Sequence, residues 1–198
     1  MQLFCRVVDN NNCRFYLLPR RRSAGFTLIE MIITVAIAAI LMSIAVPSFQ
    51  QMMQQNRTAA VTNQLLGTFR MARSEAVTRG KTVTVCKSAN VTATNPTCTT
   101  DGNWETGWLI FVDDNNNGSV DTGELIKVGQ LEAGQATIAG NGVLINQISF
   151  ASSGKTTSST MASLIIQQSA ESESCRKITV NRVGRIFSEE KHGAECVL

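Results

Sequence analysis

The chain has 198 residues, which suits one modest domain with an additional segment and excludes two full domains. Its formal net charge is +3, from 18 Lys and Arg residues against 15 Asp and Glu residues. Five of the arginines precede residue 26: Arg6, Arg14, Arg20, Arg21 and Arg22. Because basic and acidic residues nearly balance in the remainder, the net charge does not indicate a nucleic-acid-binding function.

Residues 26–46 form an apolar run in which Glu30 is the single charged residue. About 20 apolar residues are what an α-helix needs to cross a bilayer core, so the run predicts a membrane-spanning helix. The arginines before it predict that its N-terminal end faces the cytoplasm. A carboxylate in such a segment is costly unless it is neutralised or paired, which makes Glu30 a candidate functional residue.

Three interpretations of this segment are open. A plain membrane anchor leaves Glu30 unexplained. A secretory signal peptide would be cut after the apolar core, near Ser43-Ile44-Ala45, but an acid inside that core argues against it. The third interpretation rests on residues 20–30, which read RRRSAGFTLIE and resemble the class III leader of type IV prepilins.

The resemblance to prepilins implies a role for each residue at this junction. A prepilin peptidase would cut after Gly25 and methylate the new N-terminus at Phe26, and other pilins would be the partners. Glu30 would meet the N-terminal amine of a neighbouring subunit, where each buried charge supplies the partner that the other needs. Pro47 lies where these proteins commonly have a helix-bending proline. The chain would then be an inner-membrane, single-pass protein whose head is periplasmic and which assembles into a filament.

The helix is expected to continue beyond Pro47. Apolar residues recur at helical spacing and predict one buried stripe, made of Val61, Leu65, Phe69, Ala72 and Ala76. Gly80 is a suitable stop. The predicted organisation is therefore a leader at 1–25, a helix at 26–80 with its transmembrane part at about 26–46, and a β-rich head at 81–198.

The head is expected to be built from short strands separated by polar turns. The expected strands are 82–87, 108–112, 125–131, 143–150, 163–167, 177–181 and 184–187, and exposed loops are expected at 89–103 and 152–161. The predicted fold class is therefore α+β, with one long N-terminal helix, half membrane-spanning and half amphipathic, packed on an antiparallel sheet.

Residues 71–80, MARSEAVTRG, narrow the resemblance to the FimT/FimU/GspH group of minor pilins and pseudopilins. The strand GWLIFVD at 107–113 and the pair Gly184-Arg185 also match that group. The resemblance implies a type IV pilin-like fold. It also implies a structural subunit of the tip or initiation complex of a type IV pilus or type II secretion pseudopilus. We find no catalytic constellation and expect no enzymatic activity.

Four of the six cysteines follow the apolar run, which suggests disulfides in an oxidising compartment. They are Cys86, Cys98, Cys175 and Cys196, and three pairings are open. We favour Cys86–Cys98 and Cys175–Cys196, because each closes a local loop.

One segment fits the pattern of a calcium-binding loop. It offers Asp113, Asn115 and Asn117 at alternate positions, then a glycine, and ends in Glu124. An expected strand precedes it, so it is not an EF-hand. A polar hairpin turn with its acids in solvent remains the alternative, in which no cofactor is bound.

A small basic cluster near the C-terminus includes Arg182 and Arg185. In FimT-type DNA-uptake pilins, a G-R-x-R motif near this point is implicated in DNA contact. Here the motif ends in Phe187 instead of arginine, and flanking glutamates weaken the positive field. DNA binding for natural transformation is therefore an alternative function, but DNA is not the favoured partner.

Overall fold

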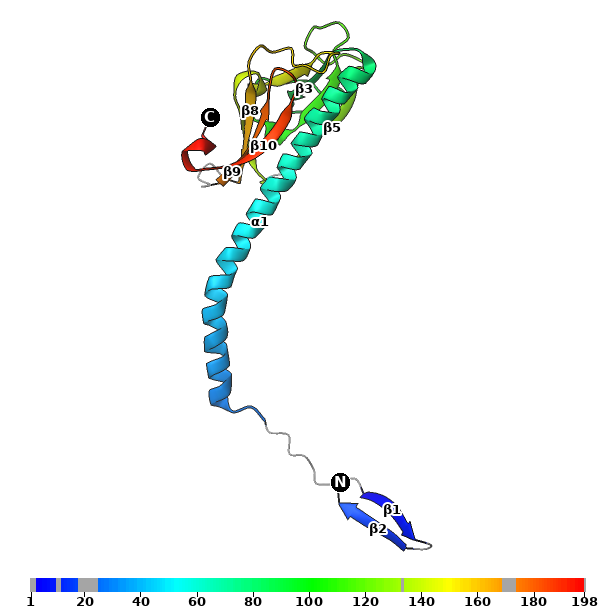
Figure 1. The fold of residues 1–198 in the computed structure, drawn as a ribbon, viewed down its shortest axis with the longest axis vertical. Helices are drawn as coiled ribbons and strands as arrows, with labels where there is room; N and C mark the ends of the chain where they lie inside the picture. The colour runs from blue at the N-terminus through cyan, green and yellow to red at the C-terminus, as the bar shows by residue number, and fades with distance from the viewer. Residues whose placement is uncertain (1–2, 10–11, 18–24, 133, 169–173, 198) are drawn as a thin grey trace. The chain divides into compact units, whose positions relative to one another are not determined.

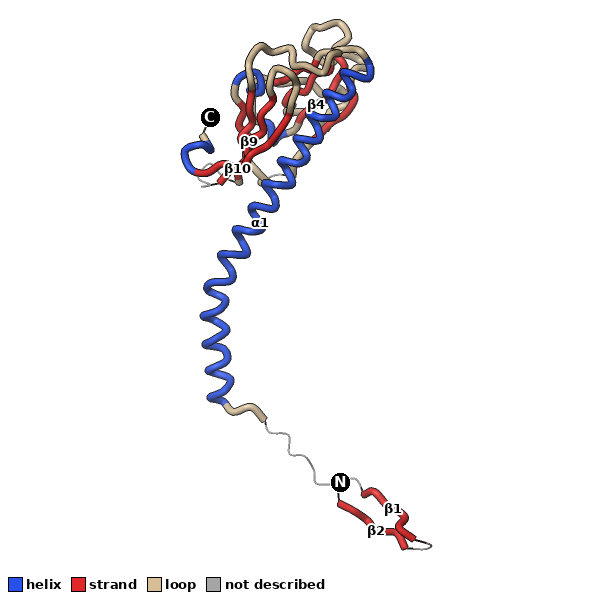
Figure 2. Tube along the Cα trace, viewed as in Figure 1, coloured by secondary structure: helices blue, strands red, loops and turns tan. Residues whose placement is uncertain are grey.

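The computed structural model describes residues 3–9, 12–17, 25–132, 134–168 and 174–197 (Figure 1). The chain divides into two compact units, Met1–Ser48 and Phe49–Leu198. Each unit is described by itself below, and Figure 2 marks its helices and strands along the chain.

The first unit contains a hairpin that the sequence analysis does not anticipate. Strands β1 (Leu3–Asp9) and β2 (Asn12–Leu17) pair antiparallel, within the segment expected to be a leader. Helix α1 (Leu28–Arg79) then begins after Thr27, whose Oγ1 accepts a hydrogen bond from the backbone N–H of Glu30 at 3.2 Å. Thr27 therefore caps the helix.

Helix α1 confirms the expected long helix, with ends displaced by one or two residues. It continues through Pro47 and ends at Arg79. Gly80 follows with a φ of +66°, the left-handed conformation that commonly ends a helix.

The second unit holds two four-stranded antiparallel sheets on the later part of α1, where the sequence analysis expects one sheet. One sheet has the order β5-β4-β3-β7, with β3 at Val83–Lys87, β4 at Trp108–Val112, β5 at Leu125–Gly129 and β7 at Gln147–Phe150. The other has the order β10-β9-β8-β6, with β6 at Thr137–Gly140, β8 at Ala162–Gln167, β9 at Ser174–Val180 and β10 at Ile186–His192.

The structure contains one strand that was not expected and differs from the expectation for another. Strand β6 is not anticipated, and the strand expected at 143–150 begins instead with a 3-10 helix at Gly142–Ile145. Leu144 is fully buried in that turn, and its carbonyl accepts a hydrogen bond from the indole N–H of Trp104 at 2.7 Å. The carbonyl is thus paired with a side chain instead of a neighbouring strand.

The core forms between the predicted stripe of α1 and both sheets. Leu65, Phe69 and Ala72 are fully buried, and they share one cluster with inward-facing residues of β3, β4, β8 and β9. The rings of Phe69 and Trp104 meet edge to face, with centroids 6.1 Å apart. These contacts join the helix to the sheets through burial of apolar surface.

Strand β4 is buried on both faces, which explains its continuous apolar sequence. Trp108 and Ile110 face the main core, whereas Leu109 and Phe111 pack in a second cluster with Val91. Part of the loop expected to be exposed at 89–103 therefore covers the outer face of this sheet.

The burial of Phe69 predicts a large effect of its truncation. We expect Phe69→Ala to lower the free energy of unfolding by about 3–5 kcal/mol, because it removes buried apolar surface and leaves a cavity. Thermal unfolding of the full chain in detergent, followed by circular dichroism, measures the change. Phe49→Ala is the matched control, because Phe49 is 61% exposed. Equal effects of the two substitutions would contradict this assignment of the core.

Candidate functional site

The expected assembly residues lie at the start of α1. Phe26 is 82% exposed, and Glu30 is exposed in the first helical turn. A Thr with an acid three residues later is the pattern of a capping box, and an acid at a helix N-terminus interacts favourably with the helix dipole. Among the described residues, the hydrogen bond that Glu30 makes with Thr27 uses its backbone N–H, so its carboxylate is available to a partner.

Large apolar side chains are exposed along the first part of α1. They include Leu28, Ile29, Met31, Ile32, Ile33, Val35, Ile37, Ile40, Leu41, Met42, Ile44 and Val46. Within the part of the chain that the structure describes, α1 is the one helix long and apolar enough to cross a membrane. A helix that is apolar all round needs an apolar environment, which lipid or other helices supply.

Pro47 is exposed inside α1. It has no backbone N–H, so the helix lacks one internal hydrogen bond at this point. The next residue, Ser48, donates its hydroxyl to the carbonyl of Ile44 at 3.2 Å. Helix α1 therefore continues without interruption through Pro47, the residue that is expected to bend it.

The candidate calcium residues occupy the connection between β4 and β5. Asp113 is only 6% exposed, and its Oδ2 accepts a hydrogen bond from the backbone N–H of Gly118 at 3.1 Å. The Oδ1 of Asn115 accepts from the N–H of Asn117 at 3.0 Å, and the Oδ1 of Asn117 accepts from the N–H of Ser119 at 2.7 Å. These hydrogen bonds between side-chain oxygens and backbone N–H groups therefore fix the turns of the loop.

Glu124 lies at the end of this loop but faces backbone amides. Its two carboxylate oxygens accept hydrogen bonds from the N–H groups of Asp114 and Asp121, at 3.1 and 3.0 Å. Among the described residues, no three His, Cys, Asp or Glu side chains converge as metal ligands. Any metal site here therefore also needs amide or backbone oxygens.

Arg182 and Arg185 are exposed on the turn between β9 and β10. Asn181 closes the turn, because its Oδ1 accepts a hydrogen bond from the N–H of Arg185 at 2.9 Å. The Arg185 guanidinium lies 5.7 Å from the ring centroid of Phe187. Phe187, which stands where the G-R-x-R motif has its second arginine, thus makes a cation–π contact with Arg185, the first arginine of that motif.

Arg73 is a residue whose role the sequence analysis misses. From α1 its Nε donates to the carbonyl of Gly154 at 2.9 Å, and its second terminal nitrogen lies 3.4 Å from the carbonyl oxygen of Val183. Gly184 packs so closely there that a Cβ atom on it would overlap the Gly154 oxygen. The glycine of the Gly184-Arg185 pair is therefore required by packing.

The structure contains the two disulfides favoured from the sequence. Cys86–Cys98 and Cys175–Cys196 each have a Cα–Cα distance of 5.6 Å. The first ties the loop after β3 to that strand, and the second ties the C-terminal 3-10 helix at Gly193–Cys196 to β9. Both links hold segments that contribute little to the main core.

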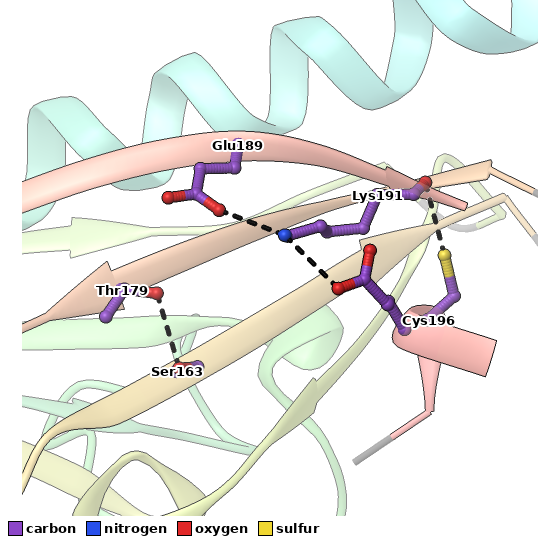
Figure 3. A network of polar contacts seen from close by, with 6 residues as sticks. Ser163, Thr179, Glu189, Lys191 and Cys196 are labelled. Atoms are coloured by element: carbon purple, nitrogen blue, oxygen red, sulfur yellow. Dashed lines mark hydrogen bonds and ion pairs between the residues drawn. The ribbon is translucent and has the colours of Figure 1, made fainter. Parts of the chain in front are cut away.

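A network of polar contacts lies near Cys196, one of the two cysteines of the second disulfide (Figure 3). Lys191 lies 3.3 Å from a carboxylate oxygen of Glu189 and 3.4 Å from one of Glu195. The hydrogen bond with Glu189, and then that with Glu195, raises the pKa of the Lys191 ammonium above its ordinary value. Because the pKa is raised in the folded chain, this stabilisation is present at neutral pH and is lost as the pH rises through the folded-state pKa.

Comparisons with known proteins agree with this arrangement. Residues 61–184 match the family described as type II transport protein GspH, and residues 20–46 match the prokaryotic N-terminal methylation motif. Fimbrial protein Q of Moraxella bovis is 38% identical over 78 residues, which are 39% of this chain. The chain spans about half the length of that relative, since the match covers 49% of it.

Two crystal structures of the type IV minor pilin FimU from Pseudomonas aeruginosa share the fold. One has a TM-score of 0.57 and 20% identity, over 72% of this chain and 97% of FimU. The other has a TM-score of 0.53 and 17% identity, over 70% of this chain and 99% of FimU. The expected type IV pilin-like fold is thereby confirmed.

The contact between Gly154 and Gly184 predicts a position-specific effect of alanine. Gly184→Ala should cost about 1–2 kcal/mol for its left-handed backbone, which has a φ of +75°, and about 1–3 kcal/mol more for the overlap. Gly193→Ala is the control, because Gly193 has a φ of +57° but nothing within 4 Å of a Cβ position. Denaturant unfolding of the full chain measures both, and equal losses would contradict the packing role.

Proposed function

The chain belongs to the family of the type II transport protein GspH, and we propose that it serves as a minor subunit in the tip or initiation complex of a type IV pilus or type II secretion pseudopilus. The single observation that carries this proposal is the first part of α1, whose membrane-length apolar window has no buried residues. In the proposed cycle, inner-membrane lipid surrounds this surface before assembly. Helices of other pilins replace the lipid in the filament, and the head lies in the periplasm.

Processing by a prepilin peptidase would create the assembly contact. Cleavage after Gly25 would remove the leader and leave a methylated ammonium on Phe26. The exposed Glu30 of a neighbouring subunit would then supply the opposite charge. In a low-dielectric environment each group is costly alone, so the pair favours one register between subunits.

The proposal predicts that Glu30→Leu impairs assembly into the filament but leaves processing by the peptidase unchanged. Membrane insertion and cleavage should stay normal, because the apolar segment becomes more apolar. Recovery of the variant with partner pilins should fall strongly, since loss of one member of a buried charge pair costs about 3–5 kcal/mol. Mass spectrometry of the N-terminus and quantification of the chain in sheared filaments measure the two steps.

Glu132→Leu is the control for loss of a surface acid, because Glu132 is exposed on the head. Normal filament incorporation of Glu30→Leu would refute the pairing role. An unmodified chain that begins at Val46 would refute prepilin processing altogether. The gene can also be deleted and piliation, protein secretion and DNA uptake measured separately. The activity that is lost shows whether the chain serves a type IV pilus, a type II secretion pseudopilus or DNA uptake.

DNA binding is a second candidate function, because Arg182 and Arg185 are both exposed on one turn. Nearby glutamates reduce the positive charge that the surrounding basic residues can offer to DNA. Arg176 lies 3.8 Å from Glu190, and Lys191 is held by Glu189 and Glu195. Binding would be driven by phosphate contacts and would be independent of sequence.

We therefore expect weak DNA binding that is detected only at low salt. A cluster of this size neutralises only about two to four phosphates, so the affinity should be low and should fall further as the salt concentration rises. Mobility-shift titration of the full chain in detergent tests this, with Arg185→Ala and Phe187→Arg as variants and Lys127→Ala as a charge-matched control. Tight binding at physiological salt that Arg185→Ala abolishes would make DNA uptake the leading function.

A further inference from the structure

The connection between β4 and β5 is unusually long for neighbouring antiparallel strands. Strand β4 ends at Val112 and β5 begins at Leu125, whereas hairpin connections usually have about two to five residues. Both ends of the connection are held by the backbone. The N–H of Asp113 donates to the carbonyl of Thr82, and the N–H of Val112 donates to that of Glu124, each at 2.9 Å. The loop is therefore a defined structure on a rigid base.

Asp113 leaves one buried oxygen unused. The side chain is 94% buried, given its 6% exposure, and its Oδ1 has no hydrogen-bond partner among the described residues. The sister oxygen, Oδ2, accepts the N–H of Gly118 across the loop, so the carboxylate faces the interior of the loop. A buried carboxylate oxygen without a donor is costly, so a water molecule or an ion from outside the chain is needed to complete it.

The rest of the loop presents oxygens at the positions that a calcium loop uses. Counted from Asp113, the third, fifth, ninth and twelfth residues are Asn115, Asn117, Asp121 and Glu124, and the seventh offers its backbone carbonyl. Gly118 is the sixth residue and has a φ of +72°, as the sharp turn of such a loop requires.

The charges in the loop also call for a cation. Asp113, Asp121 and Glu124 take part in none of the salt bridges among the described residues. The neighbouring Asp114 differs, because it points to Lys81, with Nζ and Oδ2 2.6 Å apart. The other three acids have no positive partner among the described residues, and their hydrogen bonds come from neutral groups: Asp121 accepts from the side-chain amides of Asn115 and Asn117 at 2.7 and 2.9 Å.

We propose that residues 113–124 bind a calcium ion. The ligands are carboxylate oxygens of Asp113 and Glu124, amide oxygens of Asn115 and Asn117, and the carbonyl of Ser119, and Asp121 at the ninth position acts through a water molecule. Six or more oxygens suit Ca²⁺, which accepts irregular geometry more readily than Mg²⁺ does. The ion links both ends of the loop and stabilises the β4–β5 hairpin. This inference is independent of how the chain assembles.

Calorimetric titration with calcium chloride tests the site, using the full chain purified in detergent and stripped with a chelator. We expect one saturable site with a dissociation constant of about 10⁻⁴–10⁻³ M, the range of extracellular calcium modules. Calcium should also raise the unfolding temperature, because it binds only the folded loop. Magnesium at the same concentration should bind at least about tenfold more weakly.

Asp113→Asn and Glu124→Gln should each weaken calcium binding at least about tenfold, because each removes a charged ligand. Asp113→Asn keeps an oxygen for the N–H of Gly118, whereas Glu124→Gln keeps an acceptor for only one of the two N–H groups that Glu124 binds, so circular dichroism checks that both variants fold. Asp114→Asn is the matched control, since it removes the same charge from the same loop but not a ligand. The absence of saturable binding by the unmodified chain would overturn the proposal, as would equal weakening by Asp114→Asn.

Discussion

The head depends on one apolar face of α1. Leu65, Phe69, Ala72 and Ala76 are fully buried in a cluster that also contains the inner faces of both sheets. Each sheet is small, and a small sheet with one apolar face is unstable unless something covers that face. The helix also offers a polar contact, because the indole N–H of Trp108 donates to the hydroxyl of Thr68 at 3.1 Å. The hydrophobic effect thus holds the sheets on the helix, and the paired indole avoids a buried unsatisfied donor.

The same helix has apolar residues in two different settings. In its later part, Val61 and Leu65 are at most 2% exposed, whereas Leu28 and Ile44 in its earlier part are 78% and 67% exposed. Helix propensity does not distinguish these parts, because both are rich in good helix formers. The difference lies in what the chain itself supplies: the head covers the later stripe with its own strands. The earlier part needs an environment from outside the described chain, and this requirement is the physical basis for assembly.

Features with a local signal could be predicted from the sequence, and features made by distant residues could not. The stripe from Val61 to Ala76 has the helical period, and the β4–β5 loop carries its pattern in consecutive residues, so both are visible in one window. The division into two sheets depends on which strands pair, and no local pattern specifies that β8 lies between β6 and β9. The same reason hides Arg73, whose main hydrogen bond reaches a residue 81 positions away. The 3-10 helix around Leu144 has no local signal either, because the indole of Trp104, 40 positions away, donates to its carbonyl.

Two turns of the head begin in the same way, and their difference explains why only one calls for a cation. Strands β4 and β9 each end on a buried valine, Val112 or Val180, and the next residue is Asp113 or Asn181. In each turn that side chain accepts a backbone N–H across the turn, from Gly118 in the first and from Arg185 in the second. An asparagine that does this adds no charge, so the second turn is complete and can present its arginines to solvent. An aspartate in the same place, buried to 94%, has a second oxygen that accepts no hydrogen bond among the described residues, and burial makes such an oxygen costly. The exchange of a neutral for a charged acceptor at the end of a core strand therefore converts a self-contained turn into one that needs a positive ligand.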